Sequence, residues 1–182
     1  MNARVKFALG TAVAGALAVA GSVAVAGGGS REVSGSLTGY EEVPAVSTAA
    51  NGKFRATVAP SDTGLAYKLT YAGLEGGVTQ AHIHFAQAGV NGGISVWLCG
   101  TGTNPGPAGT PACPTPSGTV EGTIDAADVL GPVGQGIAPG ELAELLRAMR
   151  AGVTYANVHS TAFPGGEIRS QLRAGPRWGY GG

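Results

Sequence analysis

The sequence predicts an all-β protein, an antiparallel, Greek-key-like β-sandwich or barrel that carries one short amphipathic helix. Short runs in which apolar and polar residues alternate recur along the chain, as expected for strands with one buried face. Glycine and proline separate these runs, and 33 of the 182 residues are glycine, which is typical of a chain with many tight turns. One segment departs from the two-residue period and follows the helical period instead.

The clearest strand is residues 65–71, in which leucine and tyrosine alternate with Ala66, Lys68 and Thr70. Turn signals precede two other strands, namely Asn-Gly-Gly at residues 91–93 and Pro-Gly-Gly at residues 164–166. In chain order, the predicted strands are residues 33–37, 53–58, 65–71, 79–85, 94–98, 118–122, 153–159 and 167–172.

The predicted helix covers residues 141–150. Its leucines and its methionine recur at the i, i+3, i+4, i+7 spacing of one helix face. Glutamates lie in the first turn and arginines in the last, which suits the helix dipole. Pro139 stands near its start and Gly152 follows its end. The apolar face should cover an open end or edge of the sandwich.

The N-terminal segment has the features of a secretory signal peptide. Basic residues precede an apolar run that extends to about Val25, and Ala24-Val25-Ala26 supplies a cleavage pattern of small residues before Gly27. An uncleaved anchor is the alternative, since the run approaches the length of a membrane span. The sequence thus predicts a signal peptide at residues 1–26, one domain at residues 32–173, a flexible tail at residues 174–182, and a secreted or periplasmic location.

The charge balance favours neither nucleic acid nor a membrane surface. The chain has 11 basic and 11 acidic residues, and two of the basic ones, Arg4 and Lys6, lie in the predicted signal peptide. We expect an extracytoplasmic partner of unidentified kind, no nucleic acid, and no stable membrane anchor after cleavage. Adjacent Glu41 and Glu42 are expected to bind backbone N–H groups or an arginine, with a calcium or ligand contact as the alternative.

The two cysteines are expected to form a disulfide. Cys99 and Cys113 bracket residues 100–112, which are rich in glycine, proline and threonine and cannot bury a core of their own. In an exported protein, a cysteine pair of this kind is usually a structural crosslink. Closing a loop of about 15 residues contributes roughly 3 kcal/mol in the chain-entropy model.

All three histidines lie on two of the predicted strands. His82 and His84 alternate within residues 79–85, and His159 ends residues 153–159. Side chains two residues apart on a strand start about 6.5–7 Å apart, so two imidazoles can lean onto one ion at ligand distances of about 2 Å. If the two strands are neighbours, the three rings form a three-nitrogen site that suits copper or zinc.

Strand alternation places the histidines on a polar face, which we expect to form an outer surface of the sheet. Asn157, Glu167 and Arg169 share that face, and Glu167, Asn157 or Gln80 is expected to hydrogen-bond the ring nitrogens that do not bind metal. In a metal-free alternative, the histidines are surface residues that orient loops. If the protein is a binding module and not an enzyme, Arg169 is expected to pair with Glu167.

Five blocks of sequence follow one another in a distinctive order. They are GYEEVPAV at residues 39–46, AHIH at 81–84, NGG at 91–93, AGVTYANVHS at 151–160 and PGGEIRSQL at 164–172. Their order and spacing resemble the CHRD domain, first described as a repeat in chordin, over about residues 32–173. Ser170 stands where many members of that family have glycine. The resemblance implies a secreted, β-rich domain and no firm biochemistry.

A weaker resemblance points to copper-zinc superoxide dismutases. A His-x-His strand, a downstream disulfide loop, the late His159 and then Arg169 follow the order of elements in those enzymes. The additional histidines of the zinc part of that site are missing here, which leaves a copper-only or mononuclear centre.

Three functions therefore stay open at this point. The first is an extracytoplasmic binding module without catalytic activity, which binds copper or another transition metal through His82, His84 and His159. The second is a copper-dependent oxidoreductase of the superoxide dismutase kind, in which Arg169 guides the substrate. The third is a metal-free protein-interaction domain.

Overall fold

The structure is a computed structural model that describes residues 31–176 and residue 178. The predicted signal peptide at residues 1–26, its cleavage site and Tyr180 lie outside the described residues. Within the described part of the chain, no helix is long and apolar enough to cross a membrane.

The described part of the chain forms nine strands and one α-helix, and eight of the strands and the helix are at or close to the predicted positions. Each of the eight predicted strands is present, and a ninth short strand follows them. The helix α1 spans Leu142–Arg150. The strands are β1 (Glu32–Thr38), β2 (Asn51–Val58), β3 (Leu65–Ala72), β4 (Val78–Phe85), β5 (Gly93–Gly100), β6 (Gly118–Ile124), β7 (Thr154–Ser160), β8 (Ile168–Gln171) and β9 (Arg173–Ala174).

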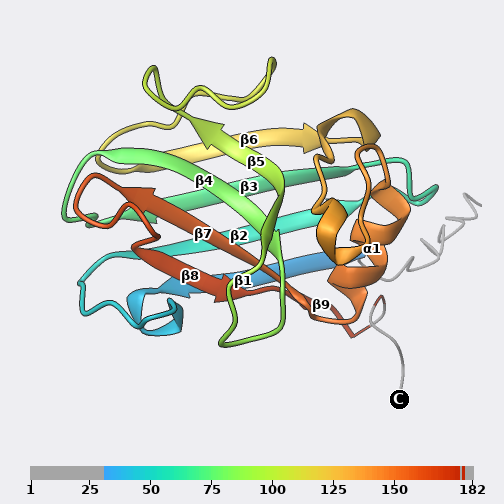
Figure 1. Cartoon of the computed structure of the whole chain (residues 1–182), viewed down its shortest axis with the longest axis horizontal. Coiled ribbons are helices and arrows are strands. Elements are labelled where there is room, and N and C mark those ends of the chain that lie inside the picture. The colour runs from blue at the N-terminus through green and yellow to red at the C-terminus, as the bar shows by residue number, and fades with distance from the viewer. Residues whose placement is uncertain (1–30, 177, 179–182) are drawn as a thin grey trace, which may run out of the picture.

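The strands form one antiparallel sheet that folds back on itself. Its order is β5-β4-β7-β8-β1-β2-β3-β6, with β9 beside β1. Figure 1 shows β4, β5, β7 and β8 in front of β1, β2, β3 and β6. The two ends of the path meet again, because β5 contacts β6 and the Tyr67 hydroxyl of β3 donates to the carbonyl of Leu98 in β5 at 2.6 Å. The predicted sandwich or barrel is confirmed.

The core lies between the two layers. It is made from the inward-facing residues of every long strand, including Phe54, Leu69, Ile83 and Val158, all of which are fully buried. α1 lies across one end of the layers (Figure 1) and buries its leucines and Met149 there. The amphipathic helix therefore covers an open end of the sandwich, as its apolar face predicts.

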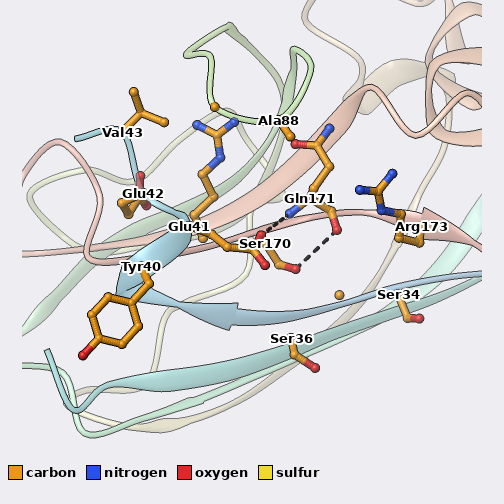
Figure 2. A pocket seen from close by; sticks show the side chains of 13 residues that line it. Ser34, Ser36, Tyr40, Glu41, Glu42, Val43, Ala88, Ser170, Gln171 and Arg173 are labelled. Carbon is orange, nitrogen blue, oxygen red and sulfur yellow. Dashed lines mark hydrogen bonds between the residues drawn. The ribbon is translucent and has the colours of Figure 1, made fainter. Parts of the chain in front are cut away.

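The seam between β1 and β8 is loosely paired. β8 pairs with β1 at one position, Thr38 with Arg169, and the Glu41 carboxylate accepts a hydrogen bond from the backbone N–H of Gln171 at 2.9 Å. Glu41 thus binds a backbone N–H group, as we expect of this acidic pair. A groove of about 490 Å³ lies over the seam (Figure 2).

The predicted tail begins inside the fold. β9 covers Arg173–Ala174, and the side chain of Trp178 is buried. The guanidinium of Arg150 lies 4.5 Å from the centre of the Trp178 ring, so a cation–π contact holds this tryptophan against α1. Trp178 of the predicted tail is therefore packed against the fold, while the remaining tail residues beyond Pro176 lie outside the described part.

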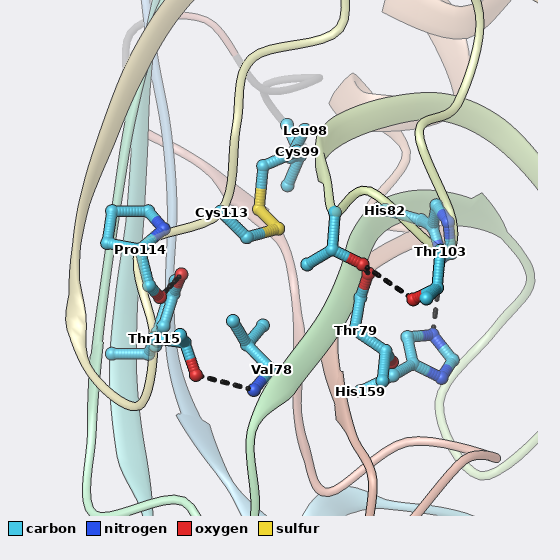
Figure 3. Close-up of a disulfide and its surroundings, with 12 residues drawn as sticks. Val78, Thr79, His82, Leu98, Cys99, Thr103, Cys113, Pro114, Thr115 and His159 are labelled. Atoms are coloured by element: carbon cyan, nitrogen blue, oxygen red, sulfur yellow. Dashed lines mark hydrogen bonds between the residues drawn. A yellow bond between two sulfur atoms is a disulfide. The ribbon is translucent and has the colours of Figure 1, made fainter.

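The predicted disulfide is present. Cys99, at the end of β5, is bonded to Cys113 in the segment before β6 (Figure 3). Two backbone hydrogen bonds lie beside the disulfide. The N–H of Cys113 donates to the carbonyl of Gly100, and the N–H of Gly100 donates to the carbonyl of Pro111. The segment between the cysteines is therefore anchored at its base.

We expect replacement of both cysteines by serine to lower the free energy of unfolding by about 2–4 kcal/mol without changing the fold. The loss follows from the extra conformational freedom of the unfolded chain. Urea titration followed by circular dichroism measures it, with native-state spectra as the control for folding. An unchanged unfolding free energy would show that the crosslink is dispensable.

Candidate metal centre

The pairing of β4 with β7 brings the three histidines together. In this antiparallel pair, Gln80 is opposite His159 and His82 is opposite Asn157. Alternate side chains of both strands point to the same side of the sheet, so His82, His84 and His159 share one face. One ring nitrogen from each lies within 4.8 Å of those from the other two. The predicted convergence of the three imidazoles is confirmed.

The predicted exposure of this face is wrong. His82, His84 and His159 are only 0%, 7% and 6% exposed, and every residue of β7 is buried. The reason is that two turns and a tryptophan of the neighbouring strand β5 cover the polar face. The β4–β5 turn reaches His84, the β7–β8 turn reaches His159, and the Trp97 ring packs edge-on against His82 at 4.4 Å.

Backbone carbonyls fix the protonation of two of the rings. Nδ1 of His84 lies 3.0 Å from the carbonyl oxygen of Gly92, and Nδ1 of His159 lies 2.9 Å from that of Pro164. A carbonyl oxygen can only accept a hydrogen bond, so each Nδ1 carries the proton in the neutral ring. The lone pair is therefore on Nε2 in His84 and His159.

His82 stands between these two rings and the tryptophan. Its Nδ1 lies 3.2 Å from Nε2 of His159 and donates to that lone pair, while its Nε2 is buried without a partner. Figure 3 shows the rings of His82 and His159 linked in this way beside the disulfide loop.

Burial keeps the histidines neutral. It lowers the pKa of His82 to about 2, with the neighbouring His159 and His84 adding to the effect. Burial also lowers the pKa of His84 to about 4, although the hydrogen bond to Gly92 opposes it. The pKa of His159 is lowered by burial as well. Neutral imidazole is the form that binds a metal ion.

Glu167 and Arg169, which were predicted to lie beside the histidine rings, form hydrogen bonds with other residues. Glu167 accepts hydrogen bonds from the Thr48 hydroxyl at 2.8 Å and from the N–H of Glu75 at 2.9 Å. Arg169 donates to Asn91 at 3.0 Å and to the carbonyl of Val90 at 2.8 Å. Neither binds a histidine, and the expected Glu167–Arg169 pair does not form among the described residues.

Arg169 instead orders the β4–β5 turn from within the sheet. Its guanidinium lies 3.4 Å from the centre of the Tyr155 ring of β7. His84 of β4, on the other side of β7, stacks on the same ring with 4.6 Å between the ring centres. Arg169 is 1% exposed. A cation so deeply buried and so fully bonded cannot act as an exposed guide for an anionic substrate.

Glu42 is a buried acid that the sequence does not single out from Glu41. Its side chain is buried in the loop before β2, and burial raises its pKa to about 7, opposed by a backbone hydrogen bond from Val43, by Arg169 and by Asn157. The two consecutive glycines at residues 165–166 indicate a place where another part of the chain approaches the backbone closely. Any Cβ at Gly166 would collide with Glu42 Oε1, so only glycine permits this approach.

A comparison with family models identifies the region that holds these residues. A model described as the CHRD domain matches residues 33–172, which confirms the resemblance seen in the sequence and its extent. The match includes all three histidines and the disulfide. No curated protein and no solved structure matches the chain.

The buried histidines should make the metal-free protein sensitive to acid. Their pKa values are lower in the folded state than the value of 6.5 expected in the unfolded chain, so below pH 6.5 the unfolded state binds protons that the folded state excludes. Between pH 7 and pH 5, His82 and His84 should each cost about 2 kcal/mol of unfolding free energy. Urea titrations after chelator treatment measure this loss.

Glu42 acts in the opposite direction, because its pKa is higher in the folded state than in the unfolded chain. The titrations are therefore best made in the Glu42→Gln variant, which removes that contribution. Substituting His82 and His84 by glutamine in this background should flatten the pH dependence. Equal stability of the Glu42→Gln protein at pH 5 and pH 7 would contradict the account.

Proposed function

Because this chain belongs to the CHRD domain family, we propose that it is an extracytoplasmic binding module that binds a transition-metal ion through His82, His84 and His159. The ion is copper or zinc, both of which bind imidazole well. The disulfide supports an oxidising compartment, since crosslinks of this kind persist outside the cytoplasm.

The hydrogen bonds to Gly92 and Pro164 carry the proposal. A histidine that binds a metal ion through one nitrogen usually donates its other N–H to a carbonyl or carboxylate, which fixes the ring and its tautomer. His84 and His159 have that arrangement before any ion is bound. Histidines that merely orient loops would have no reason to bring one ring nitrogen each within 4.8 Å of the others.

Unpartnered polar atoms on the buried face of β4 and β7 support the proposal. Nε2 of His82, Nε2 of His84 and Oδ1 of Asn157 are all buried without a hydrogen-bond partner. Such groups are uncommon in folded proteins, because each costs about 1–3 kcal/mol. An ion would satisfy the imidazole nitrogens, which accept no other bond. In binding the ion, His159 Nε2 would exchange the hydrogen bond from His82 for a metal bond.

The buried position favours retention of an ion over catalysis at an open surface. The rings are neutral at pH 7, so the ion displaces no proton from His84 or His159. Among divalent ions, copper should bind more tightly than zinc at a site of this composition.

Chelator-treated protein should bind zinc or copper with one ion per chain. In competition with a chromophoric chelator, His84→Gln should weaken the affinity by about 100-fold or more, because a ligand and its carbonyl-fixed geometry are both lost. At a free zinc concentration of 100 times Kd, the wild-type protein should gain about 2.7 kcal/mol of unfolding free energy.

Ser95→Ala is the matched control. Ser95 is buried on the neighbouring strand β5, and its hydroxyl also lacks a partner, yet it offers no imidazole. The Ser95→Ala protein should bind the ion with the same affinity as the wild type. Failure of the wild-type protein to bind either ion would favour a metal-free interaction domain.

A further inference from the structure

Asn157 occupies the central position of the buried polar face. It is opposite His82 of β4 on one side and opposite Arg169 of β8 on the other. The residue is 3% exposed, and its side-chain oxygen Oδ1 has no hydrogen-bond partner. A buried amide oxygen therefore stands among the histidines with an unused lone pair.

Glu42 determines which way this amide faces. A Cβ at Gly166 would lie 3.0 Å from Nδ2 of Asn157 and would collide with Oε1 of Glu42, so the amide nitrogen and the carboxylate crowd the same spot. With the NH₂ group on the side of Glu42, the carbonyl oxygen Oδ1 lies on the other side of the amide, away from the carboxylate.

We propose that Oδ1 of Asn157 is the fourth ligand of the metal centre and that Glu42 positions it by accepting from Nδ2. This inference rests on the proposed function of the three histidines. Three imidazole nitrogens and one amide oxygen give the four-coordinate geometry that zinc prefers. The oxygen also favours divalent ions over Cu(I), which is selected by sulfur ligands.

The other polar residues of this face already form hydrogen bonds, although Oε2 of Glu167 and Oε1 of Gln171 also lack a partner. Glu167 accepts from Thr48 and Glu75, and the NH₂ group of Gln171 donates to the carbonyls of Ala86 and Gly152. Arg169 carries a positive charge and has no lone pair to offer. Asn157 differs from them because it lies on β7 directly opposite His82 of β4, and its side-chain oxygen forms no hydrogen bond.

The most direct test uses the wild-type protein. Addition of zinc to chelator-treated protein labelled with ¹³C at asparagine should shift the side-chain carbonyl signal of Asn157 and leave that of Asn91, which accepts from Arg169, unchanged. An unshifted Asn157 signal in protein saturated with zinc would overturn the proposal.

Variants test the same point through affinity and coordination. Asn157→Leu keeps the volume and removes the oxygen, so zinc affinity should fall by about 100-fold, and the visible absorption of the cobalt-loaded protein should lose its four-coordinate character. Asn157→Asp retains an oxygen ligand and should preserve that spectrum, which separates a ligand from a packing role. Circular dichroism of the metal-free variants checks that both fold.

Glu42 has a matched neighbour for comparison. Glu42→Leu removes the acceptor that positions the amide and should weaken zinc binding about 10-fold, within the range seen for partners that orient ligands. Glu41→Leu removes the adjacent carboxylate, which binds the N–H of Gln171 instead, and should leave zinc affinity unchanged.

The outcomes separate this proposal from the one on which it rests. If His84→Gln abolishes zinc binding while Asn157→Leu matches the wild type in affinity and cobalt spectrum, the three-histidine site stands and the fourth ligand is wrong. If the wild-type protein binds no metal, both proposals are overturned.

Discussion

The outer face of β4, β7 and β8 is polar and yet buried, so each group on it needs a partner inside the protein. The surrounding loops supply most of those partners through backbone carbonyls. Gly92 and Pro164 bind His84 and His159, while Val90 binds Arg169. The loops that bury this face therefore keep the imidazoles neutral and also fix their orientation. The geometry of the histidine site follows from how these loops cover the face.

Two residues make the closing turn between β4 and β5 rigid enough for this task. A side chain at Gly92 would collide with the carbonyl oxygen of Phe85, so glycine is required where the turn presses against the end of β4. Arg169 holds the opposite side of the turn through Asn91 and Val90. A buried arginine that donates to three loop atoms has a structural role, and the loss of one partner of such a buried charge is costly.

The sequence predicts the strands, the helix, the disulfide and the meeting of the three histidines because each depends on a local pattern. Alternation assigns side chains to faces, and a shared face on neighbouring strands brings His82, His84 and His159 together. Exposure is a different property, since it depends on loops that carry no periodic signal. Carbonyls as partners of His84 and His159 were not predictable, because every residue carries a carbonyl. Glu42 was likewise indistinguishable from Glu41, since only the folded loop decides which of them is buried.

The central claim is that His84 and His159 present Nε2 lone pairs to a common metal ion while carbonyls hold their Nδ1 protons. Long-range ¹H–¹⁵N correlation spectra of the histidine rings measure this directly in protein with and without zinc. The account predicts Nδ1–H tautomers for both residues in the metal-free protein and a shift of both Nε2 signals on addition of equimolar zinc. Protons on Nε2, or spectra that zinc leaves unchanged, would contradict it.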